Sequence, residues 1–246
     1  MVKTQKEIDK IRTACRICKS ILIELGEMVK EGITTYDIEK KAEELFKKNS
    51  VSPAFENYRG YPAILCVSVN EEVVHGIPSK KKVLKEGDIV SIDIGVIYDG
   101  YYGDCADTFP VGKVKDVHRN MIDVARKSFK ECLYVAIPGK KTGDIGATIE
   151  NFVKQNKFSV VREFAGHGIG KELHEYPEIP NFGENGTGEI LRENMVIAIE
   201  PMIIEHSSPV KILKDGWTVV TKNGSFSAHY ENCILIKKEA PEILTE

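Results

Sequence analysis

The chain has 246 residues, with 34 lysines and arginines against 37 aspartates and glutamates, which gives a formal net charge of −3. An apolar share of 42% excludes a disordered chain, which could not bury enough apolar surface to offset its ordering entropy. The slightly acidic balance disfavours a DNA-binding protein, since such domains are strongly basic. No apolar run approaches the roughly 20 residues that cross a bilayer. The polar start lacks the apolar core of a secretory signal, so we expect a cytoplasmic protein with no membrane partner.

The first predicted element is a helix over residues 5–30, which contains a Cys-x-x-Cys pair at Cys15 and Cys18. Between Ile8 and Leu25, the cysteines and the apolar residues recur at spacings of three and four, the stripe of an amphipathic helix. No second cysteine pair with zinc-site spacing accompanies them. We therefore interpret both cysteines as core residues, and we expect all six cysteines of the chain to be reduced.

A second predicted helix, over residues 35–49, opens an internal repeat. The segment Glu31–Ile38 resembles Pro138–Ile145, and its Gly, Thr, Asp and Ile positions recur 107 residues later. Each copy indicates a helix end at Gly, a cap at Thr and a new helix with Asp in its first turn.

A second pair of segments repeats at the same offset. Leu84–Asp93 matches Leu191–Glu200, and each is a turn followed by an apolar strand that ends in a carboxylate. Gly87 corresponds to Asn194, and both residue types tolerate a left-handed backbone. The two matches predict a single domain over residues 1–246, made of two pseudo-twofold-related halves at about 1–106 and 107–246.

The remaining elements group helices before runs of strands within each half, which indicates an α+β fold with a mainly antiparallel sheet. Strands are predicted over residues 62–69, 88–98, 101–109, 159–165, 195–204, 217–222 and 229–237, and helices over 116–136 and 142–156.

The segment around Asp99-Gly100 is a predicted β-hairpin, because this dipeptide is a strong two-residue turn signal. In that register Asp93 lies opposite Ala106, and Asp104 falls on the same face as Asp93, at a diagonal distance of roughly 7–8 Å between Cα atoms. Asp107 falls on the other face. Two inward carboxylates on apolar strands are costly without a cation, so this pair indicates a metal site more than a solvated surface.

Two further carboxylates extend the pair. The repeat places Glu200 at the position that corresponds to Asp93 in the first half. Glu231, just ahead of an apolar run, corresponds in role to Asp104. Each glutamate alone would be read as solvated, but four carboxylates in paired strand positions indicate a shared site.

Histidines complete the predicted site. His167 lies in a Gly-rich bend, His174 follows it, and His75 comes after a strand. One histidine with four carboxylates suits a hard-to-borderline divalent ion, whereas a structural zinc site would use thiolates. The other histidines are read as surface or packing residues: His118, His206 and His229.

At these residues the chain closely resembles the methionine aminopeptidases, metallopeptidases of the pita-bread fold, in its minimal, bacterial-like type I form. The ordered motifs are His75-Gly-Ile-Pro, the Asp93/Asp104 hairpin, Gly166–Gly170, Ile199-Glu-Pro-Met and Tyr230-Glu. The resemblance covers nearly the whole chain and implies helices flanking a mainly antiparallel sheet.

The resemblance also implies roles for individual residues. The metal ligands would be Asp93, Asp104, His167, Glu200 and Glu231, holding two divalent ions per chain (Co, Mn, Fe, Zn or Ni). The catalytic residues would be His75, His174 and Glu200. The substrate's methionine would contact His75, His174, Phe55, Tyr58, Tyr61, Cys66, Leu173 and Trp217. Leu173 departs from the Phe of many members, which leaves the pocket shape open. A monovalent cation near Asn70, Glu72 and Ser227 is implied only weakly.

The implied chemistry is hydrolysis by an activated water at a dinuclear metal site. Glu200 would act as general base and pass the proton to the leaving nitrogen, while His75 and His174 stabilise the transition state. The substrate would be a nascent chain or peptide with an N-terminal methionine and a small second residue.

Two rival functions remain open at this point. An X-Pro aminopeptidase or prolidase shares the fold but usually carries an added N-terminal domain, and a non-catalytic interaction protein would have lost ligands. We expect a monomer. A transient ribosome contact through Lys80-Lys81-Lys82 competes with the simpler interpretation of a solvated lysine loop.

Overall fold

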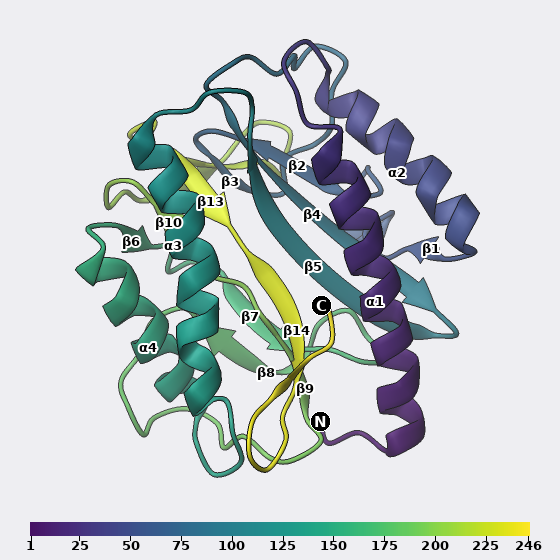
Figure 1. The fold of residues 1–246 in the computed structure, drawn as a ribbon, viewed down its shortest axis with the longest axis vertical. Coiled ribbons are helices and arrows are strands. Elements are labelled where there is room, and N and C mark those ends of the chain that lie inside the picture. Colours follow the sequence, from purple (N-terminus) through teal and green to yellow (C-terminus); the bar gives the residue numbers. More distant parts are fainter.

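The structure is a computed structural model that describes all residues, 1–246. Its four α-helices cover one side of a bent sheet as two pairs, α1 with α2 and α3 with α4 (Figure 1). The helices are α1 (Gln5–Glu27), α2 (Thr35–Asn49), α3 (Asp116–Cys132) and α4 (Thr142–Gln155). Two short 3-10 helices are η1 (Tyr58–Gly60) and η2 (Leu133–Val135). The helix expected over 116–136 therefore changes to 3-10 geometry over its last turn.

The central sheet follows the order β1-β4-β5-β14-β9-β7-β8, with β2 added on β4 and β15 added on β14. Its strands are β1 (Ser52–Pro53), β2 (Cys66–Val69), β4 (Ile89–Tyr98), β5 (Tyr101–Pro110), β7 (Ala165–Gly168), β8 (Glu175–Pro180), β9 (Val196–Ile199), β14 (Glu231–Leu235) and β15 (Glu242–Ile243). All its neighbours are antiparallel, which confirms the predicted α+β class with a mainly antiparallel sheet.

Two small sheets, β13-β10-β6 and β11-β12-β3, lie beside the central one. Their strands are β3 (Glu72–Val74), β6 (Ser159–Val160), β10 (Met202–Ile204), β11 (Val210–Ile212), β12 (Val219–Thr221) and β13 (Ser227–His229). The strands expected over 195–204 and 229–237 are each divided between sheets, at Glu200-Pro201 and at Tyr230. Proline has no N–H to give to a ladder, so the chain leaves the central sheet there and Glu200 lies at the corner.

Some strands were not predicted, and β8 is the longest of them. It carries two prolines, which argue against a strand in a sequence, yet β8 is the last strand of the sheet order, where prolines are tolerated. The other unpredicted strands, β1, β3, β11 and β15, have two or three residues each, too few for a periodic signal. The strand predicted over 159–165 is wrong in its extent, because β6 ends at Val160 and β7 lies where the Gly-rich bend was expected.

The β4–β5 hairpin has the predicted register. Asp99 and Gly100 both have positive φ, at 48° and 76°, as a two-residue hairpin turn requires. Asp93 pairs with Ala106, so Asp93 and Asp104 share the face away from the helices. Asp107 lies on the helix face, where it accepts a 2.9 Å hydrogen bond from the Arg126 guanidinium of α3.

The internal repeat is also visible in the backbone hydrogen bonds. The Gly32 N–H donates to the Leu84 carbonyl at 2.9 Å, and 107 residues later the Gly139 N–H donates to the Leu191 carbonyl at 3.0 Å. One detail differs from the prediction, which put the caps at Thr35 and Thr142: the cap residues are Thr34 for α2 and Lys141 for α4, and the Thr34 side chain accepts from the backbone N–H at N3 of its helix. The pseudo-twofold superposition of the halves stays a prediction.

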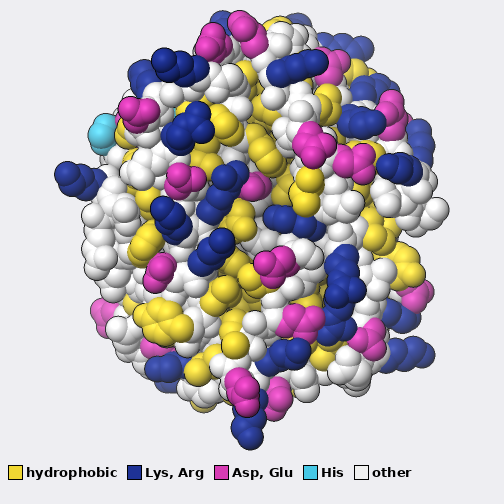
Figure 2. All heavy atoms as spheres, in the orientation of Figure 1, with side chains coloured by type: hydrophobic (Ala, Val, Ile, Leu, Met, Phe, Trp, Pro, Cys, Tyr) yellow, Lys and Arg dark blue, Asp and Glu magenta, His cyan; other side chains and the backbone are white.

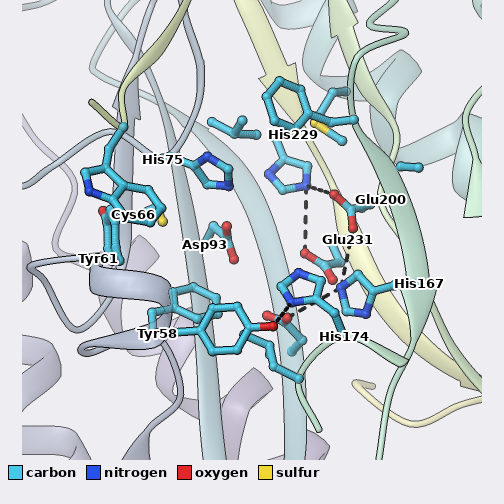
Figure 3. Close-up of a pocket in the computed structure, with 18 of the residues that line it drawn as sticks. Tyr58, Tyr61, Cys66, His75, Asp93, His167, His174, Glu200, His229 and Glu231 are labelled. Carbon is cyan, nitrogen blue, oxygen red and sulfur yellow. Dashed lines mark hydrogen bonds and ion pairs between the residues drawn. The ribbon is translucent and has the colours of Figure 1, made fainter. Parts of the chain in front are cut away.

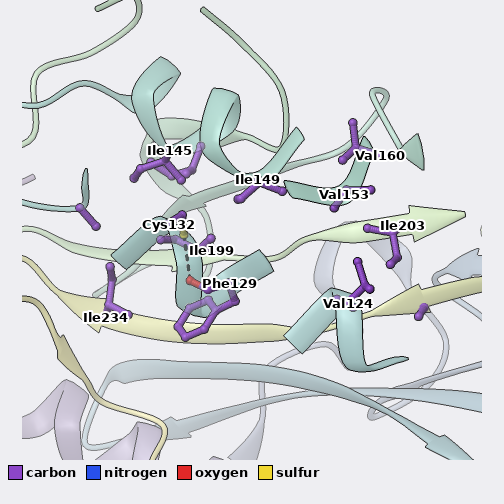
Figure 4. Packing of buried hydrophobic residues seen from close by; sticks show 14 of the residues in the cluster. Val124, Phe129, Cys132, Ile145, Ile149, Val153, Val160, Ile199, Ile203 and Ile234 are labelled. Carbon is purple, nitrogen blue, oxygen red and sulfur yellow. Dashed lines mark hydrogen bonds between the residues drawn. The ribbon is translucent and has the colours of Figure 1, made fainter. Parts of the chain in front are cut away.

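Each helix pair packs over its own part of the core. Phe129 of α3 and Ile145 and Ile149 of α4 pack with Ile199 and Ile234 of the sheet (Figure 4). The corresponding cluster under α1 and α2 includes Cys18, while Cys15 belongs to a third cluster with Leu173 and Tyr61. The six cysteines are all buried and free, which confirms the core interpretation of Cys15 and Cys18.

On the side that the helices cover, basic and acidic side chains are interspersed (Figure 2). None of the helices is both long enough and apolar enough to cross a membrane.

Candidate metal centre

A cavity of about 270 Å³ opens on the face of the central sheet that the helices leave free. All the site residues predicted from the sequence line it: Phe55, Tyr58, Tyr61, Cys66, His75, Asp93, Asp104, His167, Leu173, His174, Glu200, Trp217 and Glu231. The acidic residues gather at one end and the aromatic residues at the other (Figure 3). Segments far apart in the sequence therefore build one site.

The four carboxylates come from four neighbouring strands. Asp93 lies on β4, Asp104 on β5, Glu231 starts β14, and Glu200 follows directly on β9. One oxygen of each of Asp93, Asp104 and Glu231 is buried without any hydrogen-bond partner. Buried polar atoms are nearly always paired, so these oxygens lack the partner that a cation would supply.

The pKa values of these carboxyl groups also reflect the lack of a nearby positive charge. Burial raises the pKa of Asp93 to about 7. Burial and the nearby charge of Asp93 raise the pKa of Asp104 and that of Glu200 well above their ordinary values. The pKa of Glu231 is raised by burial and by Asp104. No lysine or arginine compensates the cluster, because none forms an ion pair with these four residues.

His167 on β7 supplies a nitrogen to the same cluster. Its Nδ1–H donates to the Gly168 carbonyl at 2.9 Å, so the lone pair of Nε2 is free to face the carboxylates. Nε2 lies 3.6 Å from Glu200 Oε1 and 4.0 Å from Asp104 Oδ2. Ligand atoms of Asp104, His167 and Glu231 all lie within 4.8 Å of one another. Carboxylate oxygens with one imidazole fit a divalent cation such as Mn²⁺, Fe²⁺, Co²⁺ or Zn²⁺.

His174 and His75 lie at the edge of the acidic cluster. The His174 ring is 4.2 Å from the His167 ring, and His174 Nδ1 is 2.8 Å from the Tyr58 hydroxyl. His174 is exposed as a residue, but desolvation of its ring beside the cavity, with His167 next to it, lowers its pKa. Burial also lowers the pKa of His75, whose ring meets Trp217 and Phe164 edge-on. Both shifts favour the neutral form of the imidazole.

The other end of the cavity is aromatic. Trp217 meets the Tyr61 ring edge-on at 5.2 Å, and the Tyr61 hydroxyl donates to backbone carbonyls, which leaves its ring face for the cavity wall. Cys66 lies beside Asp93 in the β2–β4 ladder and so connects the aromatic end to the acidic end. Leu173 is buried and belongs to the same apolar cluster.

His229 was read from the sequence as a surface or packing residue, and this interpretation is wrong. The side chain is buried at the end of β13 and lines the cavity. Its Nε2 lies 3.8 Å from Glu231 Oε2 and 4.0 Å from Glu200 Oε2 (Figure 3). Burial lowers the pKa of His229 to about 3. The signal in the sequence was its position two residues before Glu231, which places it near the same cavity.

The remaining lining residues were also not predicted: Arg59, Val74, Phe164, Ala165 and Met202. The apolar ones carry no chemical signal in a sequence. Arg59 has a left-handed backbone, with φ at 51°, within a 3-10 turn that the sequence does not mark.

The site can be compared with known proteins. The metallopeptidase family M24 profile matches residues 9–238. A methionine aminopeptidase of Clostridium acetobutylicum is 45% identical over 245 residues, which cover 100% of this chain and 98% of that protein. A crystal structure of the Thermotoga maritima methionine aminopeptidase superposes with a TM-score of 0.98, at 45% identity over 100% of this chain and 99% of that chain.

A more distant structure, a prolidase from Pyrococcus furiosus, has a TM-score of 0.79 at 25% identity, and this chain covers 65% of it. The full-length similarity therefore lies with the aminopeptidases, and the predicted pita-bread fold is confirmed. This chain belongs to metallopeptidase family M24 and, within it, to the bacterial-type methionine aminopeptidases.

Proposed function

We propose that this chain removes the N-terminal methionine of nascent proteins and peptides in the cytoplasm, using two divalent ions. Asp93, Asp104, His167, Glu200 and Glu231 would hold the ions. The observation that carries the proposal is the set of buried carboxylates without a compensating cation, next to the lone pair of His167. Bound divalent ions would neutralise this charge and supply a hydroxide-like water at neutral pH.

The side chains around the ions would carry out proton transfer and stabilise the developing negative charge. Glu200 would take a proton from the attacking water and return it to the leaving nitrogen. Because the Tyr58 hydroxyl lies 2.8 Å from His174 Nδ1 and can donate to it, the proton of His174 would lie on Nε2, free to face the substrate. His174 and His75 would then donate hydrogen bonds to the negative charge that develops on the scissile carbonyl.

The aromatic end of the cavity would hold the methionine side chain. Phe55, Tyr58, Tyr61, Cys66, Leu173 and Trp217 offer an apolar wall with a soft sulfur atom. Sulfur–aromatic contacts contribute about 0.3–1.5 kcal/mol, and each missing methylene costs about 1–3 kcal/mol in such a pocket. Methionine would therefore be preferred over alanine or glycine in first position.

The test is kcat/KM on the peptides Met-Ala-Ser, Leu-Ala-Ser, Met-Leu-Ser and Ala-Pro, with the metal content measured in the same preparations. We expect rapid cleavage only of Met-Ala-Ser. N-acetyl-Met-Ala-Ser should be inert, since the free amine would bind at the metal centre. Equal rates on Met-Ala-Ser and Leu-Ala-Ser would contradict the methionine pocket, and cleavage of Ala-Pro alone would favour the X-Pro enzyme.

The weaker expectations concern a monovalent cation, the ribosome and the oligomeric state. The Ser227 N–H donates to the Asn70 carbonyl, and the Glu72 carboxylate accepts from the Val69 N–H and contacts Lys82, which supports an ordered corner near the proposed cation. Lys82 already pairs with Glu72 and Lys80 lies over the Tyr36 ring, so Lys81 is the lysine of this loop that remains for a transient ribosome contact. We expect the chain to act as a monomer.

A further inference from the structure

His229 has a backbone that is held rigidly behind the acidic cluster. Its N–H donates to Thr108 Oγ1 at 2.9 Å, and the Thr108 hydroxyl donates back to the His229 carbonyl at 2.8 Å. Thr108 Oγ1 also lies 2.8 Å from Ser91 Oγ, which uses its remaining acceptor capacity. A buried network from β4 and β5 thus fixes the backbone from which the imidazole of His229 projects.

The Nε2 atom of the His229 imidazole faces two carboxylates. His229 Nε2 is buried without a hydrogen-bond partner, and the carboxylate oxygens nearest to it are Glu231 Oε2 at 3.8 Å and Glu200 Oε2 at 4.0 Å. A neutral imidazole carries one N–H, and Nε2 is the ring nitrogen that faces these two acceptors. Catalytic hydrogen bonds are often long without ligands and tighten in the complete site.

The two oxygens of Glu200 face two different histidines. Oε1 lies 3.6 Å from His167 Nε2, and Oε2 lies 4.0 Å from His229 Nε2. His167 Nε2 offers a lone pair, because the proton of that ring is used on the Gly168 carbonyl. An N–H at His229 would therefore give Glu200 a donor on one oxygen and leave the other free beside His167.

We propose that His229 is a positioning residue, whose Nε2–H donates to Glu200 Oε2 and fixes the rotation of that carboxylate, with Glu231 Oε2 as the neighbouring acceptor. This inference rests on the proposed function, since it assumes that Glu200 holds a metal ion. Groups that hydrogen-bond a metal ligand orient it, and removing them typically weakens metal binding about 10–100-fold.

The experiment is calorimetric titration of Mn²⁺ into the full chain after chelator treatment. We expect His229→Leu, which removes the donor, to weaken the Kd by about 10–100-fold with an unchanged number of ions. His229→Gln, which keeps an N–H at the position of Nε2, should retain the wild-type Kd. On Met-Ala-Ser, His229→Leu should lower kcat more than it raises KM.

His118 gives a matched control. It is also a buried histidine with an unpartnered Nδ1, but it stacks on Phe226 at 4.1 Å and does not line the cavity. His118→Leu should leave the Kd for Mn²⁺ unchanged. If His229→Leu fails to fold, Thr108→Val gives the second test: it keeps the imidazole but removes both hydrogen bonds to its backbone, and should weaken Mn²⁺ binding in the same direction.

The outcomes are distinct. A wild-type Kd in His229→Leu, or an equal loss in His229→Gln, would overturn the positioning role. One ion fewer in His229→Leu would also overturn it, because His229 would then be a direct ligand. If the wild-type chain itself bound no Mn²⁺, the proposed function would fail and this inference with it.

Discussion

Asp104 and Asp107 lie three residues apart on β5, on opposite faces of the same hairpin, and both carboxyl groups have a pKa raised first of all by burial. Asp107 faces the helices, where the Arg126 guanidinium and the Thr108 N–H both donate to it. Asp104 faces the cavity, where one of its oxygens has no partner at all. Asp107 therefore receives its hydrogen bonds from other residues of the chain, whereas Asp104 lacks a partner that the chain itself could supply.

The largest effect should come from neutralising the unpartnered member of this pair. We expect Asp104→Asn to lose most of its bound metal and its activity on Met-Ala-Ser, because the cluster loses a ligand. The metal-free variant should be at least as stable as the metal-free wild type, since the substitution removes a buried charge without a counter-charge. Metal analysis and urea unfolding measure the two parts, and a variant that kept its metals would contradict the role of Asp104.

A residue beside the ligands should affect turnover and not metal binding. We expect His174→Ala to retain its metal ions but to lose about 10²–10³-fold in kcat, the usual cost of removing one donor to a developing negative charge. Steady-state kinetics and metal analysis on one preparation test this. If His174→Ala lost metal as Asp104→Asn does, His174 would be a ligand.

The stability of the metal-free protein should depend on pH through the cavity-facing carboxylates. The pKa of Asp93 is raised from 3.8 to about 7, so the folded protein keeps a proton that the unfolded chain releases. The resulting stability is fully present below the unfolded value and is lost as the pH rises through the folded one. Urea midpoints of chelator-treated protein should therefore fall between pH 4.5 and pH 8, and saturating Mn²⁺ should abolish the fall at high pH.

A partnered carboxylate should show the opposite slope. Hydrogen bonds from Arg12 lower the pKa of Glu242 from 4.5 to about 2, so its contribution is present above the unfolded value and is lost as the pH falls through the folded one. In Glu242→Gln, the fall of the urea midpoint at acidic pH should become shallower, while its pH dependence at higher pH stays unchanged. An unchanged fall of the urea midpoint at acidic pH would contradict the stabilising role of the Glu242–Arg12 pair.

The smallest effect is expected on the satisfied side of the hairpin. Asp107→Asn should keep its metals and activity and lose at most about 1 kcal/mol of stability, because the amide oxygen of Asn can still accept from Arg126, whose side chain is 36% exposed, and only the charge of the pair is lost. Thermal unfolding and the Met-Ala-Ser assay measure both. A loss of metal from Asp107→Asn would remove the distinction between the two faces.

The two faces of the β4–β5 hairpin were predictable because residues close together in the sequence determine its register. Asp99-Gly100 fixes the register, and the period of two then separates Asp93 and Asp104 from Asp107. The repeat extended this reasoning to Glu200 and Glu231, and the resemblance supplied His75, His174 and the aromatic wall. His229 was not predictable in the same way, since its place depends on the break between β13 and β14, which turns one strand from the small sheet into the central one.

The short strands and the apolar lining were beyond sequence reasoning for a different reason. β1 and β15 form only because a longer strand lies next to each of them, so their own residues carry little periodicity. Met202 and Phe164 line the cavity as a result of packing between sheets. Tertiary contacts decide such positions, and a linear pattern does not record them.

The position of β14 has a consequence for when the active site forms during folding. β14 lies between β5 and β9 in the sheet and carries Glu231, yet it follows both of those strands along the chain. Until it inserts, the carboxylates of the first half face an incomplete wall. The onset of activity therefore reports that β14 has paired with β5 and β9, the long-range pairings that complete the sheet around the site.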